Sequence, residues 1–184
     1  MTPKALIRVD LQNDYFPNGR WTLNGVEAAA KNAGRALAAA RSAGELVVHV
    51  RHEFPTSDAP FFAPGSEGAA IHTSVKNLPG EPVVLKHKIN SFLETGLAEL
   101  LDRHGVKEVV IAGAMSHMCI DAVTRAAVDL GYRATVLHDA CATRDLEFEG
   151  MTVPAAQVHA TFMASLRFGY ATVVATSEHL GLVN

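Results

Sequence analysis

The chain has 184 residues, of which 48% are hydrophobic, so it can bury the core of one domain and lacks the composition of a disordered protein. Its formal net charge is −3 without clustered Lys and Arg, which excludes the basic surface typical of nucleic-acid-binding proteins. No apolar stretch is long enough to cross a membrane, and the first ten residues contain no apolar region of the signal-peptide type. We therefore expect one domain, residues 1–184, in the cytoplasm, with no nucleic-acid or membrane partner.

Short apolar segments alternate with helical segments along the whole chain. The pattern predicts six strands, at residues 6–9, 46–50, 82–85, 106–111, 133–137 and 171–174. Helices are expected from about residue 24 to 42, from 95 to 104, from Cys119 to 131 and from 153 to 168, with Asn24 and Thr95 as N-caps. Buried strands that alternate with helices form parallel sheets, so we expect a three-layer α/β/α fold with a doubly wound, Rossmann-like sheet of six parallel strands.

Residues 51–80 form a long segment, rich in Pro and Gly, that predicts no regular element. A loop of this length in a compact domain is usually a functional cover or disordered. The adjacent Phe61 and Phe62 favour an ordered cover. The candidates for the wall of a substrate pocket, each with ordinary packing as the alternative, are Phe16, Trp21, Phe61, Phe62, Asn90 and Phe92.

Three reactive side chains follow the ends of three predicted strands: Asp10, Lys86 and Cys119. The carboxyl ends of parallel strands meet at one edge of the sheet, where ligands of doubly wound folds bind. A lysine and a helix N-terminus near Cys119 favour its thiolate, and Asp10 can carry protons. The three together predict nucleophilic catalysis. Taken singly, the alternatives are a buried apolar Cys119, a capping Asp10 and a solvated Lys86.

Neither cysteine belongs to a CxxC pair, so a structural disulfide and a thiolate zinc site are not supported for Cys119 or Cys141. No GxGxxG or Walker-type loop follows the first strand, which argues against a dinucleotide or a nucleoside triphosphate. The sequence therefore indicates no cofactor.

Three stretches resemble the isochorismatase-like cysteine hydrolase superfamily. They are LIRVDLQNDYF around Asp10, EPVVLKHKINSF around Lys86, and VVIAGAMSHMCIDAVTRAAVDLGYRATVLHDACATRD around Cys119. The resemblance runs from about residue 6 to 172, and the stretch around Cys119 is its most specific part.

The resemblance implies a catalytic triad of Asp10, Lys86 and Cys119. It also implies a cis peptide bond between Ala114 and Met115, and an oxyanion hole formed by the backbone N–H groups of Met115 and Cys119. A homo-oligomer, either a dimer or a tetramer, is implied as well. Whether residues 51–80 then cover the site of their own subunit or that of a partner stays open.

The region after the second strand departs from one branch of that family. Members that hydrolyse nicotinamide carry an Asp-x-His metal motif there, with a further His. Here the region reads HVRHE, from His49 to Glu53, so no metal is expected. True isochorismatases of the family do without the cysteine, so Cys119 favours amide chemistry over vinyl-ether hydrolysis.

We therefore expect a metal-independent cysteine amidohydrolase that cleaves the C–N bond of a small molecule through a thioester intermediate. The substrate should be compact, and either uncharged or singly anionic. An isochorismatase-type vinyl-ether hydrolase is one alternative. A non-catalytic binding protein that uses Cys119 as a sensor thiol is the other.

Overall fold

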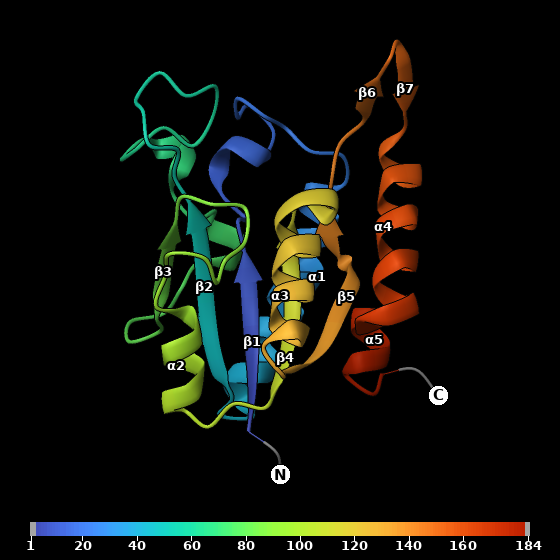
Figure 1. Cartoon of the computed structure of the whole chain (residues 1–184). Coiled ribbons are helices and arrows are strands. Elements are labelled where there is room, and N and C mark those ends of the chain that lie inside the picture. Colours follow the sequence, from blue (N-terminus) through green and yellow to red (C-terminus); the bar gives the residue numbers. More distant parts are fainter. Residues whose placement is uncertain (1–2, 183–184) are drawn as a thin grey trace.

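The computed structural model describes residues 3–182 and is built around one parallel sheet (Figure 1). Its strands are β1 (Lys4–Val9), β2 (Leu46–His52), β3 (Val83–Lys86), β4 (Glu108–Ala114), β5 (Arg133–Ala142) and β8 (Ala171–Val174). They pair in the order β3-β2-β1-β4-β5-β8, and every pairing is parallel. The prediction of six parallel strands is thus confirmed.

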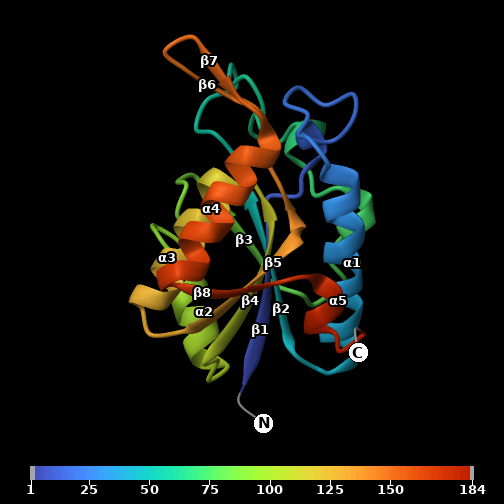
Figure 2. The ribbon, with the colours of Figure 1, turned by 90° about the vertical axis from the view of Figure 1, so that its right-hand side faces the viewer.

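Helices cover both faces of this sheet (Figure 2). One face carries α1 (Val26–Ser42) and the short α5 (Thr176–His179); the other carries α2 (Leu97–Arg103), α3 (Asp121–Asp129) and α4 (Ala155–Gly169). The buried side of α1 is largely alanine, which lets the helix lie close to the strands. The expected three-layer fold is therefore correct. No helix among residues 3–182 is both long and apolar enough to span a bilayer.

The start of α1 differs from the prediction. Gly25 occupies the N-cap with a φ of 72°, and no side chain caps the helix, so the prediction for Asn24 was wrong. The backbone N–H of Asn24 instead donates to the carbonyl of Thr143, at 2.8 Å, and this bond ties the loop to the end of β5. At α2 the hydroxyl of Thr95 does accept from the N–H of Leu97, although Gly96 is the N-cap residue.

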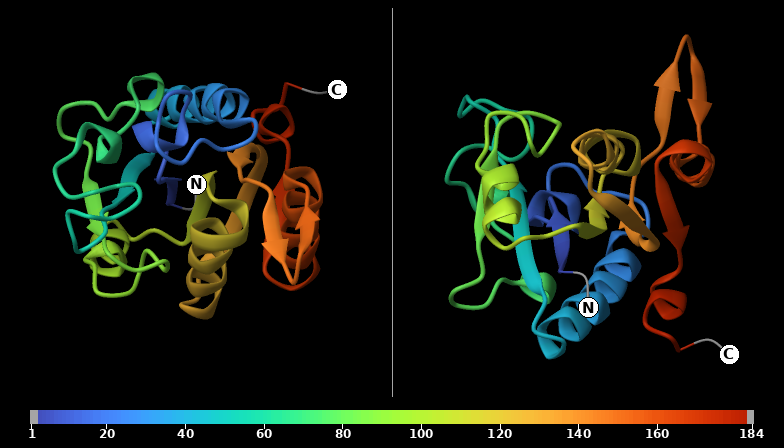
Figure 3. Two further views of the ribbon diagram at one scale, coloured as in Figure 1. Left: turned by 90° about the horizontal axis from the view of Figure 1, so that it is seen from above. Right: turned by 60° about the horizontal axis from the view of Figure 1, so that its bottom comes forward.

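A short antiparallel hairpin, absent from the prediction, precedes α4. Its strands are β6 (Leu146–Phe148) and β7 (Met151–Val153), and it stands out from the body of the protein (Figures 1 and 3). Glu149 and Gly150 both have positive φ, as a tight two-residue hairpin turn requires. Because the chain is extended up to Val153, α4 begins at Ala155, two residues later than predicted.

Residues 51–80 form an ordered cover above the carboxyl ends of the strands (Figure 3, left). Beyond the end of β2 at His52, their regular elements are two short 3₁₀ turns, Glu67–Ala69 and Thr73–Val75. Asp14 is buried and accepts from the backbone N–H of Phe62 at 2.7 Å and from that of Arg20 at 3.1 Å. This carboxylate therefore ties the cover to the loop that follows β1.

Candidate active site

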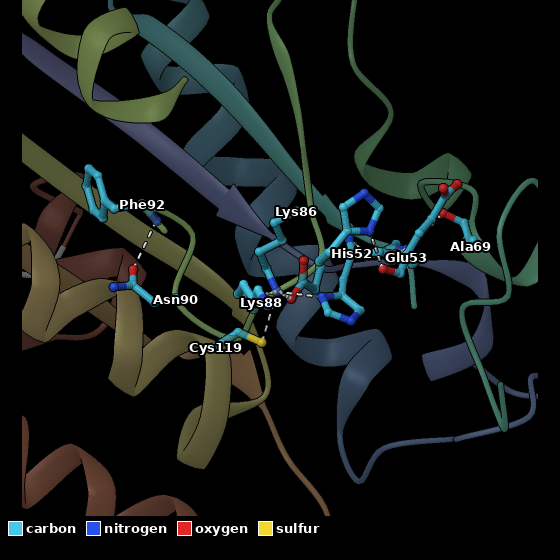
Figure 4. Close-up of polar contacts among 11 residues, drawn as sticks. His52, Glu53, Ala69, Lys86, Lys88, Asn90, Phe92 and Cys119 are labelled. Atoms are coloured by element: carbon cyan, nitrogen blue, oxygen red, sulfur yellow. Dashed lines mark hydrogen bonds and ion pairs between the residues drawn. The ribbon is translucent and has the colours of Figure 1, made fainter. Parts of the chain in front are cut away.

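The ammonium group of Lys86, the last residue of β3, lies between a carboxylate and a thiol (Figure 4). Lys86 Nζ is 2.9 Å from Asp10 Oδ2 and 3.2 Å from Cys119 Sγ. Asp10 directly follows β1, and Cys119 lies in a π-helical turn, Ser116–Ile120, that links β4 to α3. The structure thus brings together, at one edge of the sheet, three residues that are far apart in the sequence.

The backbone around this site is tightly constrained. Asp10 has a φ of 50°, in the left-handed region that residues other than glycine seldom adopt and that is enriched at functional sites. On the neighbouring strand, Gly113 has a φ of 137°, and a Cβ there would lie 1.9 Å from the carbonyl oxygen of Val9. Only glycine fits this contact, so β1 and β4 approach each other closely just below the site.

Burial dominates the electrostatics of the thiol. Only 4% of Cys119 is exposed, and burial is the largest of the effects that together raise the pKa of its thiol to about 12. The carboxylate of Asp10 acts in the same direction as burial, whereas the ammonium of Lys86 lowers the pKa. Burial thus favours the thiol. Lys86 acts in the direction that the sequence predicts, toward the thiolate, but its effect is smaller than that of burial.

The turn before Cys119 is anchored from two sides. The peptide bond between Ala114 and Met115 is cis. The hydroxyl of Ser116 donates to the carbonyl of Ala142 on β5, at 3.3 Å, and lies 2.8 Å from Nδ1 of His159 on α4. The carbonyl of Met115 accepts from the N–H groups of both Met118 and Ile120. These contacts fix the backbone that carries the thiol.

The comparison with protein families identifies this chain at the level of the family. The model of the Isochorismatase domain matches residues 4–178. The chain belongs to the isochorismatase family. Members of this family are hydrolases, and so is this protein.

Relatives agree with this assignment over most of the chain. One solved structure is the crystal structure of an isochorismatase hydrolase from Oleispira antarctica. Its sequence is 57% identical to this one and its TM-score is 0.95; the match covers 98% of this chain and 97% of that chain. The uncharacterised isochorismatase family protein YddQ of Bacillus subtilis is 49% identical, over 96% of this chain and 98% of its own length. Maleamate amidohydrolase of Pseudomonas putida is 34% identical, over 76% of this chain and 72% of its own length.

His52 is a residue of this hydrolase's site that sequence reasoning considered only in connection with a metal. Its Nδ1 lies 3.1 Å from Lys86 Nζ. The available signal was its place at the end of β2, beside the strand ends that carry Asp10 and Lys86. His49 lies elsewhere, bonded to Arg8 and Glu81. Across residues 3–182, no three His, Cys, Asp or Glu side chains are grouped as metal ligands would be.

A hollow of about 560 Å³ lies against the turn that carries Cys119. Trp21 borders it together with Met115, Met118 and residues 144–147. Two other candidate pocket residues, Phe61 and Phe62, are buried. Phe61 stacks on Trp21 with ring centroids 4.7 Å apart, so it supports this wall from behind.

The remaining candidate pocket residues lie elsewhere. Phe16 stacks on His72 at a separate hollow, with ring centroids 3.5 Å apart. Asn90 accepts from the backbone N–H of Phe92, whose ring stacks on Tyr132 (Figure 4). Of the candidate pocket residues, Trp21 therefore lines the hollow beside the turn of Cys119, whereas Phe16 and Phe92 do not.

Proposed function

We propose that this hydrolase cleaves amide-type C–N bonds of small molecules, with Cys119 as nucleophile and a thioester as intermediate. The observation that carries the proposal is the contact of one buried ammonium, Lys86, with both the Asp10 carboxylate and the Cys119 thiol, at 2.9 and 3.2 Å. A carboxylate base and a thiol that contact the same buried ammonium suit proton transfer and anion stabilisation. The relative named maleamate amidohydrolase supports amide chemistry.

In the first step, Cys119 Sγ forms a bond to the substrate's carbonyl carbon while the thiol proton passes to Asp10. The transfer accompanies the attack, because the thiol pKa of about 12 leaves almost no thiolate at rest. The carbonyl oxygen becomes an oxyanion and accepts from the backbone N–H groups of Met115 and Cys119. Lys86 stays beside Asp10 and Cys119 while the negative charge passes from the Asp10 carboxylate to the carbonyl oxygen.

In the second step, the C–N bond breaks and Asp10 returns the proton to the departing nitrogen. The acyl group remains on Cys119 as a thioester. Asp10 then takes a proton from a water molecule, whose oxygen attacks the thioester carbonyl. The carboxylic acid leaves, and the proton on Asp10 returns to Sγ. One water is consumed for each amide cleaved, and no other reagent is needed.

The hollow beside Met115 supports a small substrate with no charge or a single negative charge. Its volume of about 560 Å³ lies within the range of small-molecule sites. The guanidinium of Arg144 borders it, 4.2 Å above the ring of Trp21, and among residues 3–182 it forms no ion pair. The Nε1–H of Trp21 is buried and has no partner within the same residues. Both groups could meet a carboxylate or a carbonyl of the substrate.

The burial of Cys119 argues against the alternative of a thiol sensor. Sensor cysteines are exposed and have low pKa values, because the thiolate must meet an oxidant. Here the thiol is buried and its pKa is raised to about 12. Such a thiol reacts when a bound substrate and Asp10 act on it together.

A panel of small amides, ureides and carbamoyl compounds, assayed by ammonia release, tests the proposal. We expect hydrolysis of at least one neutral or singly anionic member, and loss of that activity in Cys119→Ala. Hydrolysis of isochorismate, with no hydrolysis of any amide in the panel, would favour the vinyl-ether alternative. Activity that survives in Cys119→Ala would contradict the role of the thiol.

A further inference from the structure

A side chain of α4 holds the turn that carries the proposed oxyanion donors. Ser116, the first residue of this turn, directly follows Met115 and has no exposed surface. Its Oγ lies 2.8 Å from Nδ1 of His159, and its hydroxyl donates to the carbonyl of Ala142 at 3.3 Å. One buried hydroxyl therefore joins the turn to α4 and to the end of β5.

The directions of these two hydrogen bonds determine where His159 carries its proton. A serine hydroxyl has one proton to donate, whereas its oxygen can accept two hydrogen bonds. Because that proton is given to the carbonyl of Ala142, Nδ1 of His159 is the donor and Ser116 Oγ is the acceptor. Burial is the larger and the charge of His138 the smaller of the two effects that lower the pKa of His159, so the ring is neutral at neutral pH.

The next residue of the turn is held from the same two sides. Nδ1 of His117 lies 2.6 Å from Oγ1 of Thr143, which follows β5. The ring of His117 meets that of Phe162 edge-on, with centroids 6.1 Å apart. Phe162 lies three residues after His159 on α4, and residues at this spacing are neighbours on one face of a helix. That face of α4 therefore contacts two consecutive residues of the turn.

The link through Ser116 acts on the peptide unit beside the Met115 N–H. The carbonyl of Met115 accepts from the N–H groups of Met118 and Ile120, at 3.0 and 3.2 Å, and the side chain of Ser116 holds the other end of the same peptide unit. An oxyanion donor is effective only when it points at the developing charge, and a displacement of about 1 Å can cost about a hundredfold in rate. His159 does not border the hollow beside Met115, so its influence on the oxyanion is indirect.

We propose that His159 is a positioning residue for the oxyanion hole: through Ser116, it holds the backbone N–H of Met115 in line with the oxyanion that forms on the substrate. This inference rests on the proposed function, in which the N–H groups of Met115 and Cys119 receive the oxyanion. His159 touches neither the substrate nor its protons. Its loss should therefore lower kcat and leave KM nearly unchanged, since the oxyanion forms only during the reaction.

Three substitutions of His159 separate the hydrogen bond from the bulk of the side chain. In His159→Asn, the side-chain amide can take the place of Nδ1 and donate to Ser116. His159→Gln carries its amide one carbon farther out, and His159→Leu has no donor. With the best amide of the panel, we expect kcat to fall about tenfold in the Leu and Gln variants and to stay within about threefold of the native value in the Asn variant. KM should stay within about twofold in all three.

Val158→Ala is the matched control on α4. Val158 precedes His159 and is buried, so its truncation weakens the packing of the helix without removing a hydrogen bond. We expect a lower melting temperature and a kcat within about twofold of the native value. A double-mutant cycle with Ser116→Ala tests the path of the effect. Once this hydroxyl is removed, His159→Leu should lower kcat by no more than about a further twofold.

Hydrogen exchange of the turn gives a second readout that needs no substrate. The N–H groups of Met118 and Ile120 both donate to the carbonyl of Met115, so their exchange reports on opening of the turn. In the peptide that contains residues 114–120, we expect exchange to be about fivefold faster in His159→Leu, as the loss of one hydrogen bond implies, and near the native rate in His159→Asn.

Three results would each overturn the inference: an unchanged kcat in His159→Leu, an equal loss in Val158→Ala, or a kcat of His159→Asn no higher than that of His159→Gln. Should His159→Leu fail to fold, as judged by circular dichroism, the comparison of the Asn and Gln variants decides.

The exchange measurement keeps this inference separate from the proposed function. The expected exchange pattern in a protein that hydrolyses none of the amides would support the anchoring by His159 and contradict the amidohydrolase. Amide hydrolysis that is lost in Cys119→Ala but unaffected in His159→Leu would do the reverse.

Discussion

In the proposed mechanism, single residues at the strand ends carry the chemistry of this protein. Asp10, Lys86 and Cys119 could be chosen from the sequence because each directly follows an apolar segment of strand type, or begins a helical one. The acidity of the thiol could not be predicted, because it depends on how deeply the folded chain buries Cys119. His52 escaped notice as a neighbour of Lys86 because strand order, which places β2 beside β3, is not written in any local pattern.

Asp10→Asn should change turnover and thiol reactivity in opposite directions. Turnover should fall by about two to four orders of magnitude, since the residue that moves the proton is lost. Alkylation of Cys119 at neutral pH should become faster, because Asp10 raises the pKa of the thiol and Lys86 would be left with the thiolate as its charged partner. Initial rates of hydrolysis and of alkylation check the two effects. A decrease in both would show that Asp10 does not oppose ionisation of the thiol.

Arg144→Gln should affect anionic substrates selectively. The guanidinium borders the hollow beside Met115 and has no carboxylate partner among residues 3–182. We expect the KM of a singly anionic amide to rise about tenfold, as the loss of one charged hydrogen bond implies, and that of its uncharged analogue to stay within about twofold. Equal changes for the two analogues would place the anionic group elsewhere.

At the level of elements, the six strands could be predicted because strand-type apolar runs and helical periodicity alternate clearly. The hairpin β6–β7 could not, because its strands have three residues each and pair only with each other. The N-cap of α1 was predicted wrongly because Asn is a common N-cap residue in local sequence patterns. In the folded chain, a long-range hydrogen bond from the backbone N–H of Asn24 to Thr143 fixes the position of Asn24.

The cover formed by residues 51–80 depends on its buried phenylalanine. Phe62 has no exposed surface and packs against Tyr15, with ring centroids 4.5 Å apart. Phe62→Ala should therefore lower the free energy of unfolding by about 3–5 kcal/mol. Phe148→Ala, at the exposed tip of the hairpin, is the matched control and should change it by about 0.5 kcal/mol or less. Urea unfolding measures both, and equal effects would contradict the packing role of Phe62.

At the scale of the whole molecule, exposed apolar side chains are frequent around one edge strand of the sheet. Among residues 3–182, five of the ten large hydrophobic side chains that are exposed come from the segment around β3: Leu78, Val83, Leu85, Ile89 and Leu93. Exposed apolar side chains at a sheet edge favour association. Their position at an edge is visible only in the folded chain, because strand order makes β3 an edge.

A homo-oligomer is therefore expected in solution, and sedimentation velocity at micromolar concentration measures it. We expect a dimer or tetramer for the native chain and a shift toward monomer for Val83→Lys. Leu130→Lys, which changes an exposed apolar side chain just after α3, is the control and should leave the assembly unchanged. A native protein that sediments only as a monomer would contradict the expectation.

The covalent role of Cys119 is tested most directly by rapid-quench mass spectrometry during turnover of the best amide in the panel. The proposed mechanism predicts that the intact protein gains the mass of the substrate's acyl group, and that the peptide containing Cys119 carries it. The adduct should decay as product acid appears, and it should be absent from Cys119→Ala. Two results together would contradict the thioester mechanism. They are steady hydrolysis without an adduct on Cys119 at any time, and hydrolysis that continues in Cys119→Ala.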